Sequence, residues 1–230
     1  MNDKRRLPAA VLKSVEAVIF DLDGLVLDTE ITYFQAWQQA ARTMGFLLPD
    51  RFCESLSGLS YREVEARMLD YCGSLLDLEA FARLSGECWY RNVTANGIAI
   101  KKGFHALHRV LLETGMRFCL ATNSGSVNAF ECLQFAGLDT VFELVVARDH
   151  VARGKPAPDI FLTAAERLSV PIACCLALED SPTGVSAASA AGAISVYIPS
   201  LVPADRYALE ICDWLCDDLD DVALVLSDMT

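Results

Sequence analysis

The chain has 230 residues, of which 53% are hydrophobic, and its formal net charge is −12 at pH 7. This composition is typical of a folded globular protein and excludes a disordered chain. The acidic balance argues against nucleic acids and anionic membranes as partners, and no apolar run approaches the roughly 18 residues of a membrane-spanning helix.

The first predicted strand is Ala17 to Phe20, a short apolar run that a Gly-containing turn follows. Asp21 and Asp23 stand at its carboxyl end, which is where ligands bind in open α/β sheets. Two carboxylates this close repel each other, and a divalent cation would relieve the repulsion and also attract phosphate. The alternative interpretation is a pair of solvated loop aspartates.

The following stretch, residues 30 to 97, contains no clear strand. It shows helical spacing over residues 32 to 44, 60 to 71 and 78 to 93. A single crossover between parallel strands needs far fewer residues. We therefore expect three parts: a loose extension of residues 1 to 14, a helical cap of residues 30 to 97, and a catalytic core of residues 15 to 29 and 98 to 230.

After the cap, apolar strand candidates alternate with helical patterns. The strands are expected at residues 117 to 121, 144 to 147, 173 to 178 and 194 to 198, and the helices at residues 104 to 113, 127 to 135, 159 to 168 and 183 to 191. Such alternation is typical of crossover units and a parallel sheet. The predicted fold class is therefore α/β, a Rossmann-like doubly wound parallel sheet with an inserted α-helical cap domain.

Polar clusters follow three of the later strands. The first, Thr122 to Ser126, offers donors for an oxyanion at a helix N-terminus, although Ser and Asn are also ordinary N-caps. The second presents Lys155 between Gly and Pro, where the alternative is a solvated surface lysine. The third is the pair Glu179 and Asp180. Because parallel strands end at one edge of the sheet, we expect these clusters to meet Asp21 and Asp23 there.

The nine cysteines contain no Cys-x-x-Cys pair. Cys174 and Cys175 are adjacent inside a predicted strand, so they point to opposite faces and cannot share a metal there. We interpret the cysteines as reduced core thiols, which favours the cytoplasm. Pro8, Lys13 and Glu16 interrupt any apolar run near the N-terminus, so no signal peptide is predicted.

From Ala17 to about Ile198 the chain resembles the haloacid dehalogenase superfamily. The similar branch has a helical cap after the first strand and includes phosphoglycolate phosphatases, β-phosphoglucomutases and sugar-phosphate phosphatases. Four motifs occur in the family's order: DxDGxxxDT at residues 21 to 29, Thr122 with Asn123, Lys155 in GKPAPD, and Glu179-Asp180 in EDSPTGV.

The resemblance implies a role for each matching residue. Asp21 would be the nucleophile that forms an aspartyl-phosphate, and Asp23 the general acid and base. Thr122, Asn123 through its backbone, and Lys155 would bind the phosphoryl oxygens. Mg²⁺ would be held by Asp21, Asp180, the Asp23 carbonyl oxygen and, directly or through water, Glu179.

The resulting hypothesis is a Mg²⁺-dependent phosphatase of a small organic phosphate monoester, such as a sugar phosphate. The nearer alternative is a mutase of the β-phosphoglucomutase type, but Tyr33 and Tyr61 stand where those enzymes carry His and Arg. A non-enzymatic phosphoacceptor or binding domain is the other alternative. In this family the cap loop faces the catalytic edge, so Gly58, Tyr61 and Arg62 are the expected specificity residues. Neither the substrate itself nor the oligomeric state follows from the sequence.

Overall fold

The computed structural model describes residues 7–56, 61–200 and 203–228, without the side chain of Tyr61. Two compact units are present, and the smaller one is a single insertion in the larger. The larger unit contains Met1–Leu27 and Ile100–Thr230, and the smaller contains Asp28–Ala99. The limits expected for this insertion from the sequence are residues 30 and 97.

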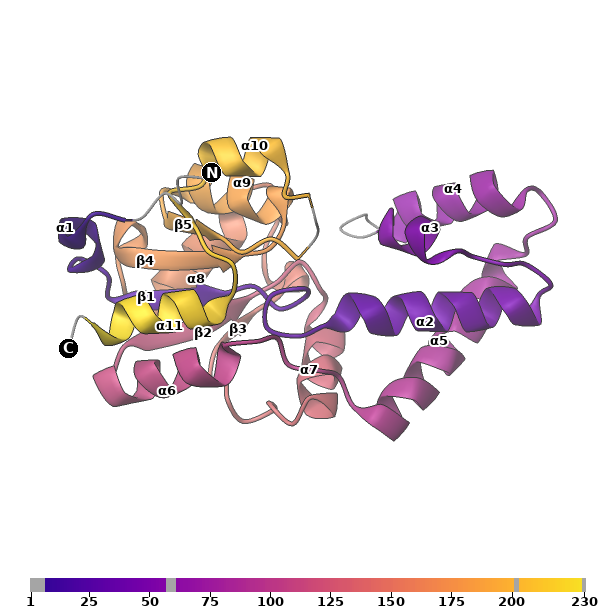
Figure 1. Cartoon of the computed structure of the whole chain (residues 1–230), viewed down its shortest axis with the longest axis horizontal. Coiled ribbons are helices and arrows are strands. Elements are labelled where there is room, and N and C mark those ends of the chain that lie inside the picture. The colour runs from indigo at the N-terminus through magenta and orange to yellow at the C-terminus, as the bar shows by residue number, and fades with distance from the viewer. Residues whose placement is uncertain (1–6, 57–60, 201–202, 229–230) are drawn as a thin grey trace. The chain divides into compact units, whose positions relative to one another are not determined.

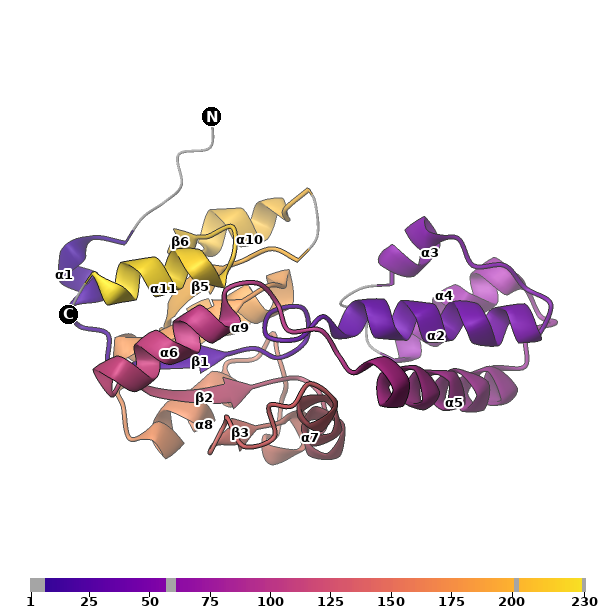
Figure 2. The same cartoon turned by 60° about the horizontal axis from the view of Figure 1, so that its bottom comes forward.

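A six-stranded sheet forms the centre of the larger unit (Figures 1 and 2). Its order is β3-β2-β1-β4-β5-β6, and every neighbouring pair is parallel. The predicted α/β fold with a Rossmann-like parallel sheet is therefore confirmed. The strands are β1 (Ala17–Phe20), β2 (Arg117–Ala121), β3 (Val145–Val146), β4 (Cys175–Glu179), β5 (Ile194–Tyr197) and β6 (Trp214–Leu215).

Helices cover both faces of this sheet because the strands are apolar on both sides. On one face α8 packs on β1, β2 and β3, and α9 packs on β4 and β5, while Figure 2 shows α6 and α11 side by side over the other face. The helices of this unit are α1 (Ala9–Leu12), α6 (Phe104–Thr114), α7 (Ser126–Phe135), α8 (Asp159–Leu168), α9 (Pro182–Ala191), α10 (Arg206–Ile211) and α11 (Leu219–Ser227), with 3-10 turns η1 (Arg148–His150) and η2 (Ile172–Cys174).

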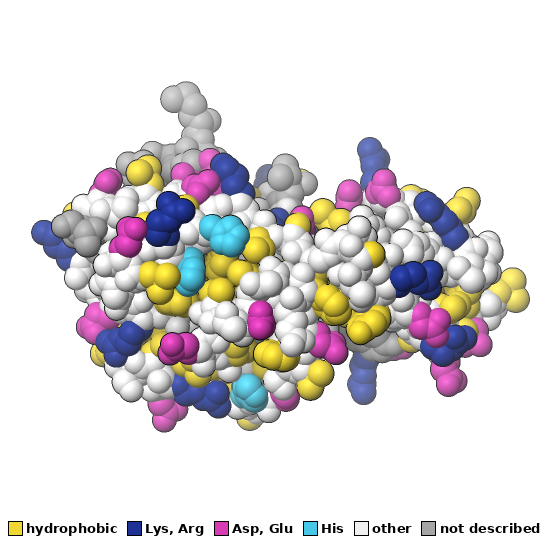
Figure 3. All heavy atoms as spheres, turned by 90° about the horizontal axis from the view of Figure 1, so that it is seen from below, with side chains coloured by type: hydrophobic (Ala, Val, Ile, Leu, Met, Phe, Trp, Pro, Cys, Tyr) yellow, Lys and Arg dark blue, Asp and Glu magenta, His cyan; other side chains and the backbone are white. Residues whose placement is uncertain are grey.

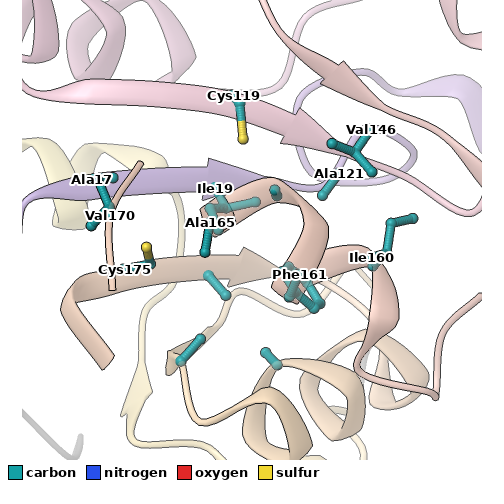
Figure 4. Packing of buried hydrophobic residues seen from close by; sticks show 14 of the residues in the cluster. Ala17, Ile19, Cys119, Ala121, Val146, Ile160, Phe161, Ala165, Val170 and Cys175 are labelled. Carbon is teal, nitrogen blue, oxygen red and sulfur yellow. The ribbon is translucent and has the colours of Figure 1, made fainter. Parts of the chain in front are cut away.

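The two faces of β1 bury different side chains. Ala17 and Ile19 join the cluster under α8 and α9, with Phe161 among its members (Figure 4). Phe20 points to the opposite face, where its ring contacts Phe104 of α6 at a centroid distance of 5.9 Å. All four residues of β1 and all five of β4 are buried, which explains why β1 is apolar throughout and β4 is apolar up to its last residue, Glu179.

The smaller unit consists of helices around its own apolar cluster. Its elements are α2 (Thr29–Thr43), α3 (Asp50–Glu54), α4 (Tyr61–Cys72) and α5 (Leu78–Asn96). Ala40, Cys53, Met68 and Phe81 bring one buried residue from each helix into that cluster. The three predicted cap helices match α2, α4 and α5 to within three residues at each end, whereas the short α3 was not predicted.

Several details differ from the sequence predictions. The strand expected at residues 173 to 178 begins at Cys175, because Ile172–Cys174 form η2, so Cys174 and Cys175 are not neighbours within one strand. β3 has two residues instead of four, and a one-turn helix, α1, lies in the extension expected to be loose. The nine cysteines all lie in the described part of the chain and are free thiols. None of the described helices has the length and apolar character needed to cross a membrane.

Candidate active site

The predicted core motifs meet at the carboxyl ends of three neighbouring strands. Asp21 follows β1, and its N–H continues the parallel pairing by donating to Leu178 O of β4 at 3.1 Å. Thr122 follows β2, and its N–H donates to Val146 O of β3 at 2.9 Å. Glu179 ends β4 and Asp180 follows it. The sheet therefore fixes the backbone under each of these side chains.

Lys155 is the centre of this arrangement. Its Nζ donates a hydrogen bond to Asp21 Oδ1 and another to the main-chain Ala121 O at 2.8 Å, and it lies 2.5 Å from Glu179 Oε1. The same atom stands 5.2 Å from the ring centroid of Phe161, in cation–π contact. Lys155 is thus a buried cation paired with two carboxylates, and the surface-lysine interpretation is wrong.

Burial and charge act against each other in this cluster. Burial lowers the pKa of Lys155, but the carboxylates of Asp21 and Glu179 outweigh it and raise that pKa overall. Burial raises the pKa of Asp21, with Lys155 opposing the shift and Asp23 adding to it. Burial likewise raises the pKa of Glu179 more than Lys155 lowers it. One ammonium group does not balance the carboxyl groups gathered here.

Three of the four predicted metal-binding residues bring carboxylate oxygens together. One oxygen each from Asp21, Glu179 and Asp180 lies within 4.8 Å of the others, and all three residues are buried. Such a set of hard oxygen ligands fits Mg²⁺. The predicted contribution of Asp23 is its carbonyl oxygen, which remains a prediction.

Two glycines make room for these acids. A Cβ at Gly24 would lie 2.0 Å from Asp180 Oδ2, and a Cβ at Gly184 would lie 1.7 Å from Glu179 Oε2. Gly24 also has a φ of +83°, a conformation that residues with side chains rarely adopt. The need for glycine at position 184 was not predicted from the sequence, because it comes from a contact between β4 and α9.

Asp23 accepts hydrogen bonds from two hydroxyl groups. Its Oδ2 accepts from Ser124 Oγ at 2.7 Å and from Thr122 Oγ1 at 3.3 Å. Asp23 is half-buried and Thr122 is buried. The predicted phosphate-binding hydroxyl therefore stands beside the predicted proton donor.

The side chain of Asn123 contacts the chain that carries Lys155. Its Oδ1 accepts from Lys155 N at 2.8 Å, and its Nδ2 donates to Lys155 O at 3.1 Å. A Cβ at Gly154 would lie 2.5 Å from Asn123 Oδ1, so this pair of hydrogen bonds needs a glycine at position 154. The amide of Asn123 thus positions Lys155, and its expected role toward phosphate is left to its backbone.

The N-terminus of α7 has a partner in the protein. Asp149 accepts from Ser126 N at 2.8 Å and from Ser126 Oγ at 2.6 Å, so it supplies the cap from the loop around η1. The cluster after β2 thus combines both interpretations that the sequence left open, since Ser126 belongs to a helix cap while Thr122 and Ser124 face Asp23.

The three predicted cap residues all belong to the smaller unit. Gly58 lies outside the described residues, as does the side chain of Tyr61, while Arg62 is exposed on α4. Tyr33 is stacked on Trp89 within the smaller unit, with ring centroids 5.7 Å apart. Specificity roles for Gly58, Tyr61 and Arg62 remain predictions.

Comparison with known proteins identifies what this chain is similar to. A family model described as haloacid dehalogenase-like hydrolase matches residues 15–192. A Drosophila melanogaster protein named probable pseudouridine-5'-phosphatase is 35% identical over 198 residues, covering 82% of this chain and 84% of that protein. The fructose-1-phosphate phosphatase YqaB of Escherichia coli is 32% identical over 181 residues, covering 76% and 92%. Among solved structures, a Thermotoga maritima protein provisionally named β-phosphoglucomutase is 28% identical with a TM-score of 0.82, covering 94% of this chain and all of the other.

Proposed function

The chain belongs to the haloacid dehalogenase-like hydrolases, and from this membership we propose that it is a Mg²⁺-dependent phosphatase of a small organic phosphate monoester. The family predicted from the four motifs is confirmed, and with it an enzyme that hydrolyses phosphoric monoesters. The non-enzymatic alternative is therefore set aside. The observation that carries the proposal is the convergence of Asp21, Asp23, Thr122 and Lys155 at one sheet edge.

The proposed reaction has two steps that use the same two aspartates. An Asp21 carboxylate oxygen bonds to phosphorus, the ester P–O bond breaks, and Asp23 gives its proton to the leaving oxygen. Water then attacks the aspartyl-phosphate while Asp23 accepts its proton, which releases phosphate and regenerates Asp21. Thr122 and Lys155 bind the phosphoryl oxygens in both steps.

Mg²⁺ fits the residues around this centre. Asp21, Glu179 and Asp180 would hold it, and its positive charge would offset the charge that develops on the phosphoryl oxygens. Glu179 is already 2.5 Å from Lys155 through Oε1, which favours contact with the metal through Oε2 or a water. Gly24 and Gly184 leave the space that the Asp180 and Glu179 carboxylates occupy.

For the substrate we propose a phosphorylated sugar or a related small molecule. This proposal rests on the substrates in the names of two relatives, one a fructose-1-phosphate phosphatase and one a probable pseudouridine-5'-phosphatase. A mutase activity is the second candidate, because a structure with a TM-score of 0.82 carries the name β-phosphoglucomutase. Tyr33, whose ring contacts those of Trp37 and Trp89, favours the hydrolase because those mutases have His at its position.

We further propose that the enzyme works in the reducing cytoplasm on a small-molecule substrate, without nucleic acid or membrane. All nine cysteines are free thiols, which suits that compartment. Lys and Arg side chains lie scattered among Asp and Glu on the face drawn in Figure 3, without a basic patch over either unit.

A panel of phosphate monoesters with Mg²⁺ tests the proposal, with phosphate release as the measurement. Asp21→Asn is expected to lose turnover while it keeps the wild-type circular dichroism spectrum, since an amide does not attack phosphorus. EDTA should remove activity and added Mg²⁺ should restore it. Full turnover in Asp21→Asn, or after complete chelation, would contradict the mechanism.

The same panel separates hydrolase from mutase. Incubation with β-glucose 1-phosphate and a bisphosphate primer is expected to give inorganic phosphate or no reaction. Efficient formation of glucose 6-phosphate would instead establish the mutase. Tyr61→Ala and Arg62→Ala should change selectivity among monoesters more than they change hydrolysis of p-nitrophenyl phosphate, because remote contacts position the leaving group.

A further inference from the structure

Ser124 places a hydroxyl directly on the carboxyl group that transfers protons in the proposed mechanism. Ser124 Oγ donates to Asp23 Oδ2 at 2.7 Å, a shorter contact than the 3.3 Å from Thr122 Oγ1 to the same oxygen. We infer that Ser124 is a positioning residue that orients Asp23 toward the leaving oxygen. This inference rests on the proposed phosphatase function.

The competition for Thr122 explains why a second hydroxyl is needed. A threonine hydroxyl has one proton to donate, so Thr122 gives it either to Asp23 or to a phosphoryl oxygen. When substrate takes that proton, Asp23 keeps the hydrogen bond from Ser124. A hydroxyl can donate to a carboxylate and equally to the carbonyl oxygen of a carboxylic acid, so Ser124 serves Asp23 in both protonation states and leaves the acid's own proton for the leaving oxygen.

The backbone around Ser124 is fixed well enough for this task. Its N–H donates to Thr122 Oγ1 at 3.0 Å, and its carbonyl oxygen accepts from Arg148 N at 3.0 Å. Both Ser124 and Asp23 are half-buried, so water competes only in part for their hydrogen bond. The backbone that carries this hydroxyl, between β2 and α7, is therefore held by hydrogen bonds on both sides.

Leaving-group dependence distinguishes a proton-transfer role from a general structural one. An alkyl phosphate needs a proton on its leaving oxygen, whereas p-nitrophenolate leaves readily without one. Ser124→Ala should therefore lower kcat for a sugar phosphate by roughly tenfold, because a hydrogen bond to a charged group contributes about that factor to a proton transfer. For p-nitrophenyl phosphate, which does not need the proton, kcat should fall by less than about twofold. Ser124→Thr, which keeps the hydroxyl, should restore the wild-type ratio between the two substrates.

Ser126→Ala is the matched control, because Ser126 is two residues away and bonds to Asp149 instead of Asp23. Its kcat ratio should equal that of the wild type. A double-mutant cycle completes the test: in an Asp23→Ala background, Ser124→Ala should cause no further loss on the sugar phosphate. A full additional loss there, equal losses on both substrates, or no loss on either would overturn the role of Ser124. A wild type that hydrolyses neither substrate would instead overturn the proposed function itself.

Discussion

Replacing Gly184 with Ala should destabilise the protein, although the same change usually strengthens a helix. Gly184 is the third residue of α9, and Ala is favoured over Gly inside helices by about 0.8–1.0 kcal/mol. An added Cβ would, however, lie 1.7 Å from Glu179 Oε2 and 2.3 Å from Glu179 Oε1. Glu179 has no exposed surface and cannot swing into solvent, so α9 and β4 must move apart and the carboxylate must shift away from Lys155.

The magnitude follows from these two consequences. Forcing extra volume into a packed interior costs about 1–3 kcal/mol. Losing a contact between charged groups costs a further 1.5–3 kcal/mol or so, and here that contact is the 2.5 Å ion pair between Glu179 Oε1 and Lys155 Nζ. After subtraction of the helix-propensity gain, the free energy of unfolding should fall by roughly 2–5 kcal/mol. Turnover should fall by about 10²-fold, because a misplacement of 1 Å in a site that includes Lys155 has that effect.

Urea unfolding and p-nitrophenyl phosphate turnover measure the two effects. Gly86→Ala in α5 is the matched control, since nothing lies within 4 Å of its added Cβ, and it should raise stability by up to about 1 kcal/mol. The reasoning is refuted if Gly184→Ala unfolds at the wild-type urea concentration or above and keeps wild-type turnover. That result would mean that the Glu179 carboxylate does not lie against α9.

Three further changes test other parts of the structure. Gly24→Ala should raise the Mg²⁺ concentration needed for half-maximal turnover, because its Cβ would lie 2.0 Å from Asp180 Oδ2. Gly45→Ala is the control, since Gly45 has a similar φ of +85° but nothing lies within 4 Å of its added Cβ; it should lower stability and leave the Mg²⁺ titration unchanged. Asn123→Ala should raise KM and lower kcat by about tenfold each, since Lys155 loses both main-chain hydrogen bonds, while Asn123→Asp keeps the acceptor for Lys155 N and should lose less. Burial lowers the pKa of His108, with His105 adding to the shift, so the unfolded chain binds the proton first and the thermal midpoint should fall as the pH drops below about 6.5. His108→Phe should flatten that decline, and an unchanged slope would contradict the burial of the His108 ring against Phe104 and Phe118.

The sequence predicts the centre of the sheet well because its strands are short apolar runs that end in polar residues. The predicted limits of β1 and β2 agree with the structure at both ends, where Asp21 and Thr122 mark the change to polar sequence. The parallel topology then brings these strand ends together without any knowledge of side-chain positions. The family motifs and the edge of the sheet were therefore predictable.

Contacts between distant segments were not predictable from local patterns. The bond from Ser124 to Asp23 and the cap that Asp149 provides for Ser126 join segments that are 101 and 23 residues apart. β6 and α10 were missed because they are short, with two and six residues, whereas α11 was missed although it has nine. A local signal did exist for α11, whose N-cap Asp218 precedes an apolar pattern and accepts from the N–H groups of Asp220 and Asp221.

The charge balance around Lys155 leads to a last prediction about how the enzyme meets an anionic substrate. The chain has a net charge of −12, and the one lysine that is buried in the described part of the chain, Lys155, is already paired with Asp21 and Glu179. With Asp23 and Asp180 nearby, a phosphate dianion would meet excess negative charge until a second cation is present. Inorganic phosphate should therefore bind at least about tenfold more tightly with Mg²⁺ than with EDTA in isothermal titration calorimetry, since an offset of one charge at an effective dielectric of 20 corresponds to more than 1.4 kcal/mol. Equal affinity under both conditions would mean that Lys155 and the Thr122 hydroxyl neutralise the phosphate by themselves, and that the acidic cluster has another purpose.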